Sequence, residues 1–190
     1  QLNMLHQFAD LVIKELEKTD YVGIATRNDA LDDAFFFAQG PVGGAGKVQF
    51  ADWKAAYESF RDVANVGAFF RQAKALQTLL ETAPPTAEQA KDLDFVLTIG
   101  HLFTLVVYGQ LILEQAAATL LDLDVLNRIF DFQIRDFSGY AVSLYGKPSA
   151  TPEQQEWALG AVRRPAPDAE SFDRVWQQVK ALDGAYVMPD

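Results

Sequence analysis

The amino-acid sequence predicts an all-α fold, a bundle of about seven or eight helices around one long apolar central helix. Apolar residues recur at spacings of three and four positions through most of the chain, which is the rhythm of an amphipathic helix. Runs that alternate apolar and polar residues, the pattern of half-buried strands, do not occur. Helix-start and helix-stop residues separate the apolar stretches. These three observations favour helices packed on helices.

The length of the chain fits one domain. Domains usually contain about 100–200 residues, and we expect a single helical domain over residues 1–190. The proline pair Pro84-Pro85 is the best candidate for a boundary between two lobes, 1–83 and 86–190. Because the chain is already in helical rhythm at Gln1, we expect it to be a fragment of a larger protein.

The first half of the chain contains four predicted helices. An apolar face over residues 1–18 predicts the first helix, and Asn28-Asp29 can cap a second helix, which a glycine-rich stretch at 40–46 must end. Helical spacing returns at 51–60. A fourth helix is predicted by the stripe of Phe69, Ala73, Leu76 and Leu80.

The longest predicted helix begins at Thr86 and runs to about Leu120. Thr86 with Gln89 three residues later has the form of a capping box. The stretch 95–113 inside this helix is nearly long enough to cross a bilayer, which takes about 20 residues. Its internal polar residues and its acidic flanks instead favour a buried helix at the centre of a soluble bundle. We therefore expect no membrane span.

Three helices are predicted in the remainder of the chain. The first carries an apolar stripe of Leu126, Phe130, Ile134, Phe137, Ala141 and Leu144. Gly146-Lys147-Pro148 ends this helix, and Thr151-Pro152 with Gln154 begins a short one. Pro165 and Pro167 break the short helix. The last helix has an apolar stripe of Phe172, Val175, Trp176 and Val179.

The composition excludes several classes of function. A net charge of -10 repels phosphate backbones, and Arg163-Arg164 is too small to form a basic patch, so we expect no nucleic-acid partner. The chain has no cysteine, which excludes disulfides, thiolate nucleophiles and cysteine-ligated metal centres. The lack of cysteine, together with an acidic, amphipathic start over residues 1–18, favours a cytoplasmic protein.

Two local motifs fail the tests for phosphate and metal binding. Gly46-Lys47 matches the end of a phosphate-binding loop, but Pro41 stands where a glycine is required and Val48 where a serine or threonine is required. We interpret this stretch as a loop between helices. The two histidines, His6 and His101, lie in no helical metal-binding motif, so no metal site is expected.

His101 and Tyr108 are candidates for a polar pocket. His101 lies within the apolar stretch, and Tyr108 follows it near the same side of the predicted helix. The main interpretation is a buried histidine that is hydrogen-bonded to its neighbours, because buried polar groups need partners. The alternative is that His101 contacts a ligand.

Arg135 is the third candidate site residue. It follows Asp131 by four positions, as Arg128 follows Asp124, and each pair predicts an ion pair on the surface of a helix. The alternative function of Arg128 and Arg135 is to grip a carboxylate or a phosphate of a partner.

Four segments carry a family resemblance: ELEKTDYVGIATRNDALDDAFFFAQGP (15–41), FTLVVYGQLILEQA (103–116), IFDFQIRDFSGYAVSLYGKPSATPEQQEWALGAVRRP (129–165) and FDRVWQQVKALDGAYVMP (172–189). They resemble the C-terminal helical region of a group of bacterial acyl-CoA dehydrogenases and the segment just before it. The family's glycine-rich motif is missing, since no Gly-Gly-x-Gly precedes Arg135-Asp136. No catalytic or flavin-binding residue of the family can therefore be assigned here.

The resemblance implies an accessory helical domain that follows the catalytic core of an FAD-dependent acyl-CoA dehydrogenase, an oxidoreductase of fatty-acid metabolism. It implies FAD and acyl-CoA in the parent protein, catalytic residues outside this chain and no cofactor in the isolated chain. The domain would pack on the catalytic core or on a sister subunit of a homo-oligomer. The competing hypothesis is a non-catalytic helical binding or dimerisation module, which the apolar central helix and the surplus of aromatic residues favour.

Overall fold

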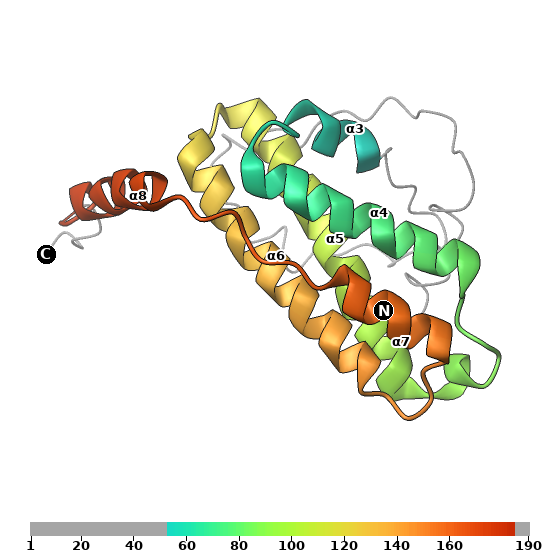
Figure 1. The fold of residues 1–190 in the computed structure, drawn as a ribbon. Coiled ribbons are helices and arrows are strands. Elements are labelled where there is room, and N and C mark those ends of the chain that lie inside the picture. Colours follow the sequence, from blue (N-terminus) through green and yellow to red (C-terminus); the bar gives the residue numbers. More distant parts are fainter. Residues whose placement is uncertain (1–52, 185–190) are drawn as a thin grey trace, which may run out of the picture.

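A computed structural model describes residues 53–184 of the chain, and these residues form helices joined by short connections (Figure 1). The α-helices are α3 (Trp53–Ser59), α4 (Ala64–Thr82), α5 (Leu93–Thr119), α6 (Leu123–Tyr145), α7 (Pro152–Ala161) and α8 (Ala169–Ala181), and a 3₁₀ turn, η2 (Gln89–Lys91), precedes α5. Helices make up 77% of the described residues, which contain no strand. The all-α prediction is confirmed.

The six α-helices between residues 53 and 184 match the predicted ones in order. The two helices predicted before residue 53 lie outside the described residues, so a total of seven or eight helices stays a prediction. The glycine-rich loop at 40–46 and His6 lie outside them as well.

Helices α4, α5 and α6 lie side by side, and the short helix α7 packs on α6 and α4 (Figure 1). Helix α6 packs against α4, α5, α7 and α8, whereas α5 packs against α3, α4, α6 and η2. The long apolar helix predicted as the central axis therefore shares that place with α6. Helix α8 stands apart at the end of an extended segment, residues 162–168, and packs on α6 alone among the described helices (Figure 1).

The buried side of α6 forms the centre of the core. Its predicted stripe is confirmed, because all of its residues are 0% exposed: Leu126, Phe130, Ile134, Phe137, Ala141 and Leu144. Aromatic rings extend the core toward α3 and α4. Tyr57 stacks on Phe70 with ring centroids 5.4 Å apart, and Phe69 meets Phe130 edge-on at 5.5 Å. Full burial of one such side chain stabilises the fold by about 1.5–3 kcal/mol, so this cluster dominates the packing.

The start of α5 differs from the prediction. The backbone N–H of Gln89 donates to the Thr86 hydroxyl oxygen at 3.2 Å, and the Thr86 N–H donates to the Gln89 side chain at 2.9 Å, as in a capping box. This box opens only the short turn η2, and α5 begins at Leu93. The reason is Asp92, whose extended backbone and carboxylate cap a new helix by accepting two amide N–H bonds of its first turn.

Residues on both sides of the proline pair belong to one packed unit. The amides of Gln89 and Gln154 exchange two hydrogen bonds of 2.8 and 3.1 Å while buried. Gln154 also donates to the carbonyl of Ala83, just before the pair, at 3.1 Å. Within residues 53–184, Pro84-Pro85 is therefore a corner between helices, and the wider division into lobes 1–83 and 86–190 stays a prediction.

Helix α5 is the one helix among residues 53–184 that is long and apolar enough to cross a membrane, with a mean hydropathy of 1.8 over its most apolar window. Half of that window, 50%, is buried inside the fold. A core helix of a soluble bundle meets the same criterion. Among the described residues of α5, Tyr108 and Leu111 are 56% and 39% exposed. The absence of a membrane span stays a prediction.

A close approach of α3 to α5 depends on Gly109. The hydroxyl of Tyr57 donates to the backbone carbonyl of Val106 at 2.6 Å, and burial raises the pKa of this hydroxyl well above its usual value, so it remains a neutral donor. A Cβ atom at position 109 would overlap the Tyr57 hydroxyl and would lie 3.3 Å from the ring of Phe130. Glycine is therefore required where the tyrosine crosses α5.

We predict that Gly109→Ala lowers the free energy of unfolding by about 1–3 kcal/mol, because the added methyl group displaces a buried tyrosine. Gly139→Ala on α6 is the matched control, since a Cβ there meets nothing within 4 Å. That control should raise stability by about 0.5–1 kcal/mol through helix propensity. Urea unfolding followed by circular dichroism measures both, and equal stability of the two variants would contradict the packing described.

Candidate functional site

A groove with a volume of about 380 Å³ lies between α6 and α8. Its apolar lining consists of Phe132, Phe172, Val175, Trp176 and Val179. Its charged lining consists of Arg128, Asp131 and Arg135. We call this the α6–α8 groove. Binding pockets usually have volumes of about 300–1,000 Å³ and an apolar lining with a few polar groups, so both its size and its chemistry suit a binding site.

The apolar stripe of α8 forms one wall of the groove and remains open to solvent. The prediction that these residues share one side of the helix is confirmed, since all of them line the α6–α8 groove. Phe172, Trp176 and Val179 are 54%, 48% and 50% exposed. On the facing wall, Phe132 of α6 is 68% exposed. Exposed apolar side chains gathered at one place are typical of interaction surfaces.

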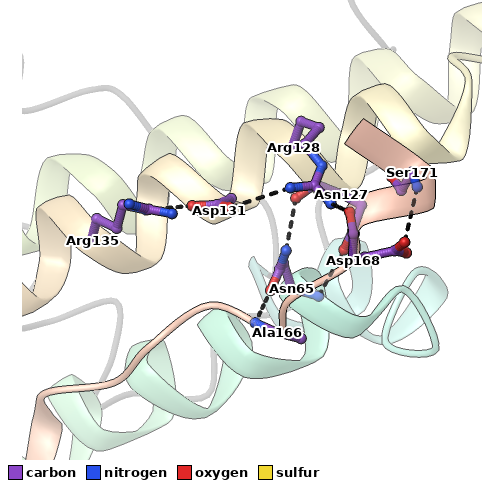
Figure 2. A network of polar contacts seen from close by, with 8 residues as sticks. All are labelled: Asn65, Asn127, Arg128, Asp131, Arg135, Ala166, Asp168 and Ser171. Atoms are coloured by element: carbon purple, nitrogen blue, oxygen red, sulfur yellow. Dashed lines mark hydrogen bonds and ion pairs between the residues drawn. The ribbon is translucent and has the colours of Figure 1, made fainter. Parts of the chain in front are cut away.

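Four residues, Asp124, Arg128, Asp168 and Arg174, hold α8 on α6, and we call them the polar latch. Arg174 of α8 donates to both carboxylate oxygens of Asp124, at 2.5 and 2.9 Å. Arg128 donates to the backbone carbonyl of Asp168, and the Asp168 side chain caps α8 by accepting the N–H of Ser171 at 2.9 Å (Figure 2). All these contacts lie in the first half of α8 or just before it. The latch therefore sets the direction in which the helix leaves the bundle.

A pair of buried asparagines holds the segment between α7 and α8. The N–H and the side-chain amide of Asn65 donate to the side chain and the carbonyl of Asn127, at 3.0 and 3.1 Å. The side-chain oxygen of Asn65 accepts the N–H of Ala166 at 2.8 Å (Figure 2). This network ties α4, α6 and the extended segment together, so the base of α8 is placed by the core.

The two arginines of the groove have different environments. Asp131 is 8% exposed and lies between them, 2.5 Å from Arg135 Nε and 3.5 Å from Arg128 Nη1 (Figure 2). The side chain of Arg128 is 17% exposed, because it is also bonded to Asp168, whereas that of Arg135 is 64% exposed. Arg135 is therefore the cation that the groove presents to an incoming anion, and Arg128 belongs to the latch.

One of the two predicted ion pairs is present and the other is wrong. Asp131 and Arg135 pair as predicted. Asp124 pairs instead with Arg174, while Arg128 pairs with Asp131. The four-residue spacing made Arg128 a plausible partner for Asp124, but Arg174 comes from a helix that local spacing cannot place.

The three candidate site residues do not form one pocket. Arg135 lines the α6–α8 groove, but His101 and Tyr108 do not. The interpretation of His101 as a buried residue is wrong, because it is exposed on α5 and stacks on Tyr140 with ring centroids 4.6 Å apart. Its apolar neighbour Leu102 is buried in the core, whereas His101 itself contacts α6 only through Tyr140 among the described ring contacts. Ligand contacts by these residues stay predictions.

Phe132 is a groove residue that the sequence analysis grouped with Phe130 as core or interface and did not place on the opposite side of the helix. It lies two positions from Phe130, which is fully buried, and side chains at that spacing point to different sides of a helix. Projecting residues 126–144 onto a helix would therefore have placed Phe132 opposite the core. The described residues contain no group of three or more His, Cys, Asp and Glu side chains that could hold a metal ion.

Comparison with protein-family models finds no family that matches the chain, and comparisons with curated proteins and with solved structures likewise find no match. The resemblance to acyl-CoA dehydrogenases rests on the sequence segments themselves.

We predict that Asp124 titrates with a pKa of about 2, because Arg174 holds its carboxylate below the ordinary value of 3.8. A lowered pKa means that the latch stabilises the fold fully above pH about 4 and loses this contribution as the pH falls toward 2. Carboxyl carbon NMR measures the titration directly. Arg174→Gln should raise the pKa of Asp124 toward its ordinary value.

Asp92 is the internal control for that titration. The Ser149 hydroxyl and the amide of Phe95 lower the pKa of Asp92, and neither contact involves α8. Arg174→Gln should leave Asp92 unchanged. A pKa of Asp124 that stays near 2 in this variant would show that α8 is not held by the latch.

Proposed function

We propose that this chain is an accessory, non-catalytic helical domain that docks on a protein surface through the α6–α8 groove. The observation that carries the proposal is the apolar face of α8, which is about half exposed although the helix is fixed in position. The proposed domain includes the two N-terminal helices expected from the sequence, which would bring the bundle to eight.

The exposure of this face indicates the strength of the interaction. Phe132, Phe172, Trp176 and Val179 are each about half exposed or more, and covering what remains would contribute about 1 kcal/mol per residue. A total of about 4 kcal/mol does not outweigh the entropic cost of joining two free molecules. The α6–α8 groove therefore suits an interface within a larger assembly, or one in which the partner contributes an equal apolar face.

Recognition of a helix fits this geometry. The walls of the groove are two helices, and an amphipathic helix laid between them would meet apolar residues on both sides. Tryptophan, phenylalanine and arginine are enriched at the centres of protein interfaces, and the groove provides all three. The latch is made before the partner arrives, so docking needs little reordering of α8.

We predict that a photoreactive benzoylphenylalanine in place of Phe172, in the full chain, forms a covalent adduct with another polypeptide on illumination, because this side chain lies in the docking face. The same residue in place of Glu156, which is exposed on α7, is the matched control and should form little adduct. Gel electrophoresis and mass spectrometry read out both. Equal labelling at the two positions, or none at Phe172, would contradict the docking role.

A second candidate names the class of the parent protein. The resemblance to acyl-CoA dehydrogenases includes residues 129–165 and 172–189, and these contain most of α6, all of α7 and most of α8. In such a cytoplasmic, FAD-dependent parent, the domain would dock on the catalytic core or on a sister subunit, and acyl-CoA would be bound outside this chain. The support for this candidate is the sequence likeness.

We predict for this second candidate that the full-length parent copurifies with flavin and shows its visible absorbance bands, while the isolated chain is colourless. Reduction of an electron acceptor in the presence of acyl-CoA measures the activity. A colourless parent that oxidises no acyl-CoA would contradict the family while leaving the docking role intact.

A further inference from the structure

We propose that the occupant of the α6–α8 groove is a second copy of this chain, and that the two α8 helices pair antiparallel about a two-fold axis. The inference rests on the proposed function, since it requires the groove to bind a protein surface. Three observations favour the chain itself as the partner: the order of the apolar residues in α8, the placement of its charges and the open second wall on α6.

The apolar stripe of α8 has the same spacing in both directions. Phe172, Val175, Trp176 and Val179 stand at intervals of three, one and three residues. A two-fold axis between Val175 and Trp176 therefore sets each apolar residue of one α8 opposite an apolar residue of the other. Phe172 faces Val179 of the partner subunit, and Val175 faces Trp176 of the partner subunit. Such self-complementarity is what an isologous interface requires.

The charges beside the stripe favour the antiparallel arrangement. Asp173 and Lys180 stand about two helical turns apart, so they lie along the same edge of the apolar stripe. In an antiparallel pair with the same axis, Asp173 lies beside Lys180 of the partner subunit, and this contact occurs twice. In a parallel pair this edge of one helix would meet the opposite edge of the other helix, so Asp173 and Lys180 would not form this contact. The charges thus select the direction in which the helices meet.

The wall on α6 completes the site for an incoming helix. Phe132 is 68% exposed and faces the α8 stripe across the groove. The latch holds α8 near its start, and the rest of the helix extends away from the other described helices (Figure 1). The α8 of a partner subunit can then lie against Phe132 and the stripe together. Each copy fills the groove of the other, so the apolar side chains that line the groove are buried in both copies.

The apolar face must drive this association. Each copy has a net charge of -10, so long-range electrostatics oppose it, and added salt screens that repulsion. An acidic partner held by Arg135 would behave in the opposite way, since salt weakens the attraction between exposed charges. Salt dependence therefore separates a second copy from a different, acidic partner.

Sedimentation of the full chain over a range of concentrations tests the proposal. We expect a monomer–dimer equilibrium that persists at about 0.5 M salt. Trp176→Glu should abolish the dimer, and Gln177→Glu, at an exposed position of α8 that faces away from the stripe, should leave it. A wild-type chain that stays monomeric at every concentration, or a dimer that dissociates in salt, overturns the proposal.

A charge swap tests the antiparallel register, because loss of folding cannot mimic a rescue. Lys180→Asp should weaken dimerisation by about tenfold, since it sets two carboxylates together at each end of the pair. The double variant Asp173→Lys with Lys180→Asp should restore the affinity to within about threefold. Failure of the double variant to recover overturns the proposed register.

Photocrosslinking at position 172 distinguishes binding of a second copy from docking on a different protein. An adduct at Phe172 with twice the mass of the chain supports the second copy. An adduct of any other mass overturns the second copy and leaves the docking role, whereas the absence of an adduct overturns both.

Discussion

The complete burial of one side of α6 is the constraint on which the rest of the structure depends. Phe130, Ile134 and Phe137 lie at the meeting point of α4, α5 and α7, and none of them is exposed. This stripe occupies one side of the helix, and the positions on the opposite side face away from the core. Phe132 and Arg135 consequently face outward, where α8 meets α6. The groove is thus a by-product of how α6 packs in the core.

Polar contacts, and not burial, hold helix α8 in place and set its direction. Among its described residues, Ser171 alone is buried. Its position depends on Arg174 with Asp124, and on the Arg128 bond to the backbone of Asp168. Because these contacts lie near the start of the helix, they orient α8 without covering its apolar side. An exposed ion pair stabilises little in water, so the latch contributes geometry more than stability.

The sequence predicted the features that depend on neighbouring residues. The stripe of α6 and the capping box of Thr151 with Gln154 follow from local spacing, and both are present. The predictions were wrong where contacts between residues far apart in the sequence determine the local structure. Thr86 caps a turn as expected, but Asp92 restarts the helix, and the contact of Asp124 with Arg174 joins helices that spacing cannot bring together. His101 is exposed because the helices described between residues 53 and 184 leave its side of α5 largely open.

Helix α8 uses one side to line the groove and another side to form the latch, and this separation determines how a partner can bind. The apolar stripe lines the groove, while Arg174 engages α6 from a different side of the same helix. A partner that covers Phe172 and Trp176 therefore need not displace the latch. If the latch had used the same side, docking would have to break it first, and the helix would lose its orientation as it bound. The two sets of residues are separate, so the site is assembled before the partner arrives, and the entropic cost of ordering α8 is already met in folding.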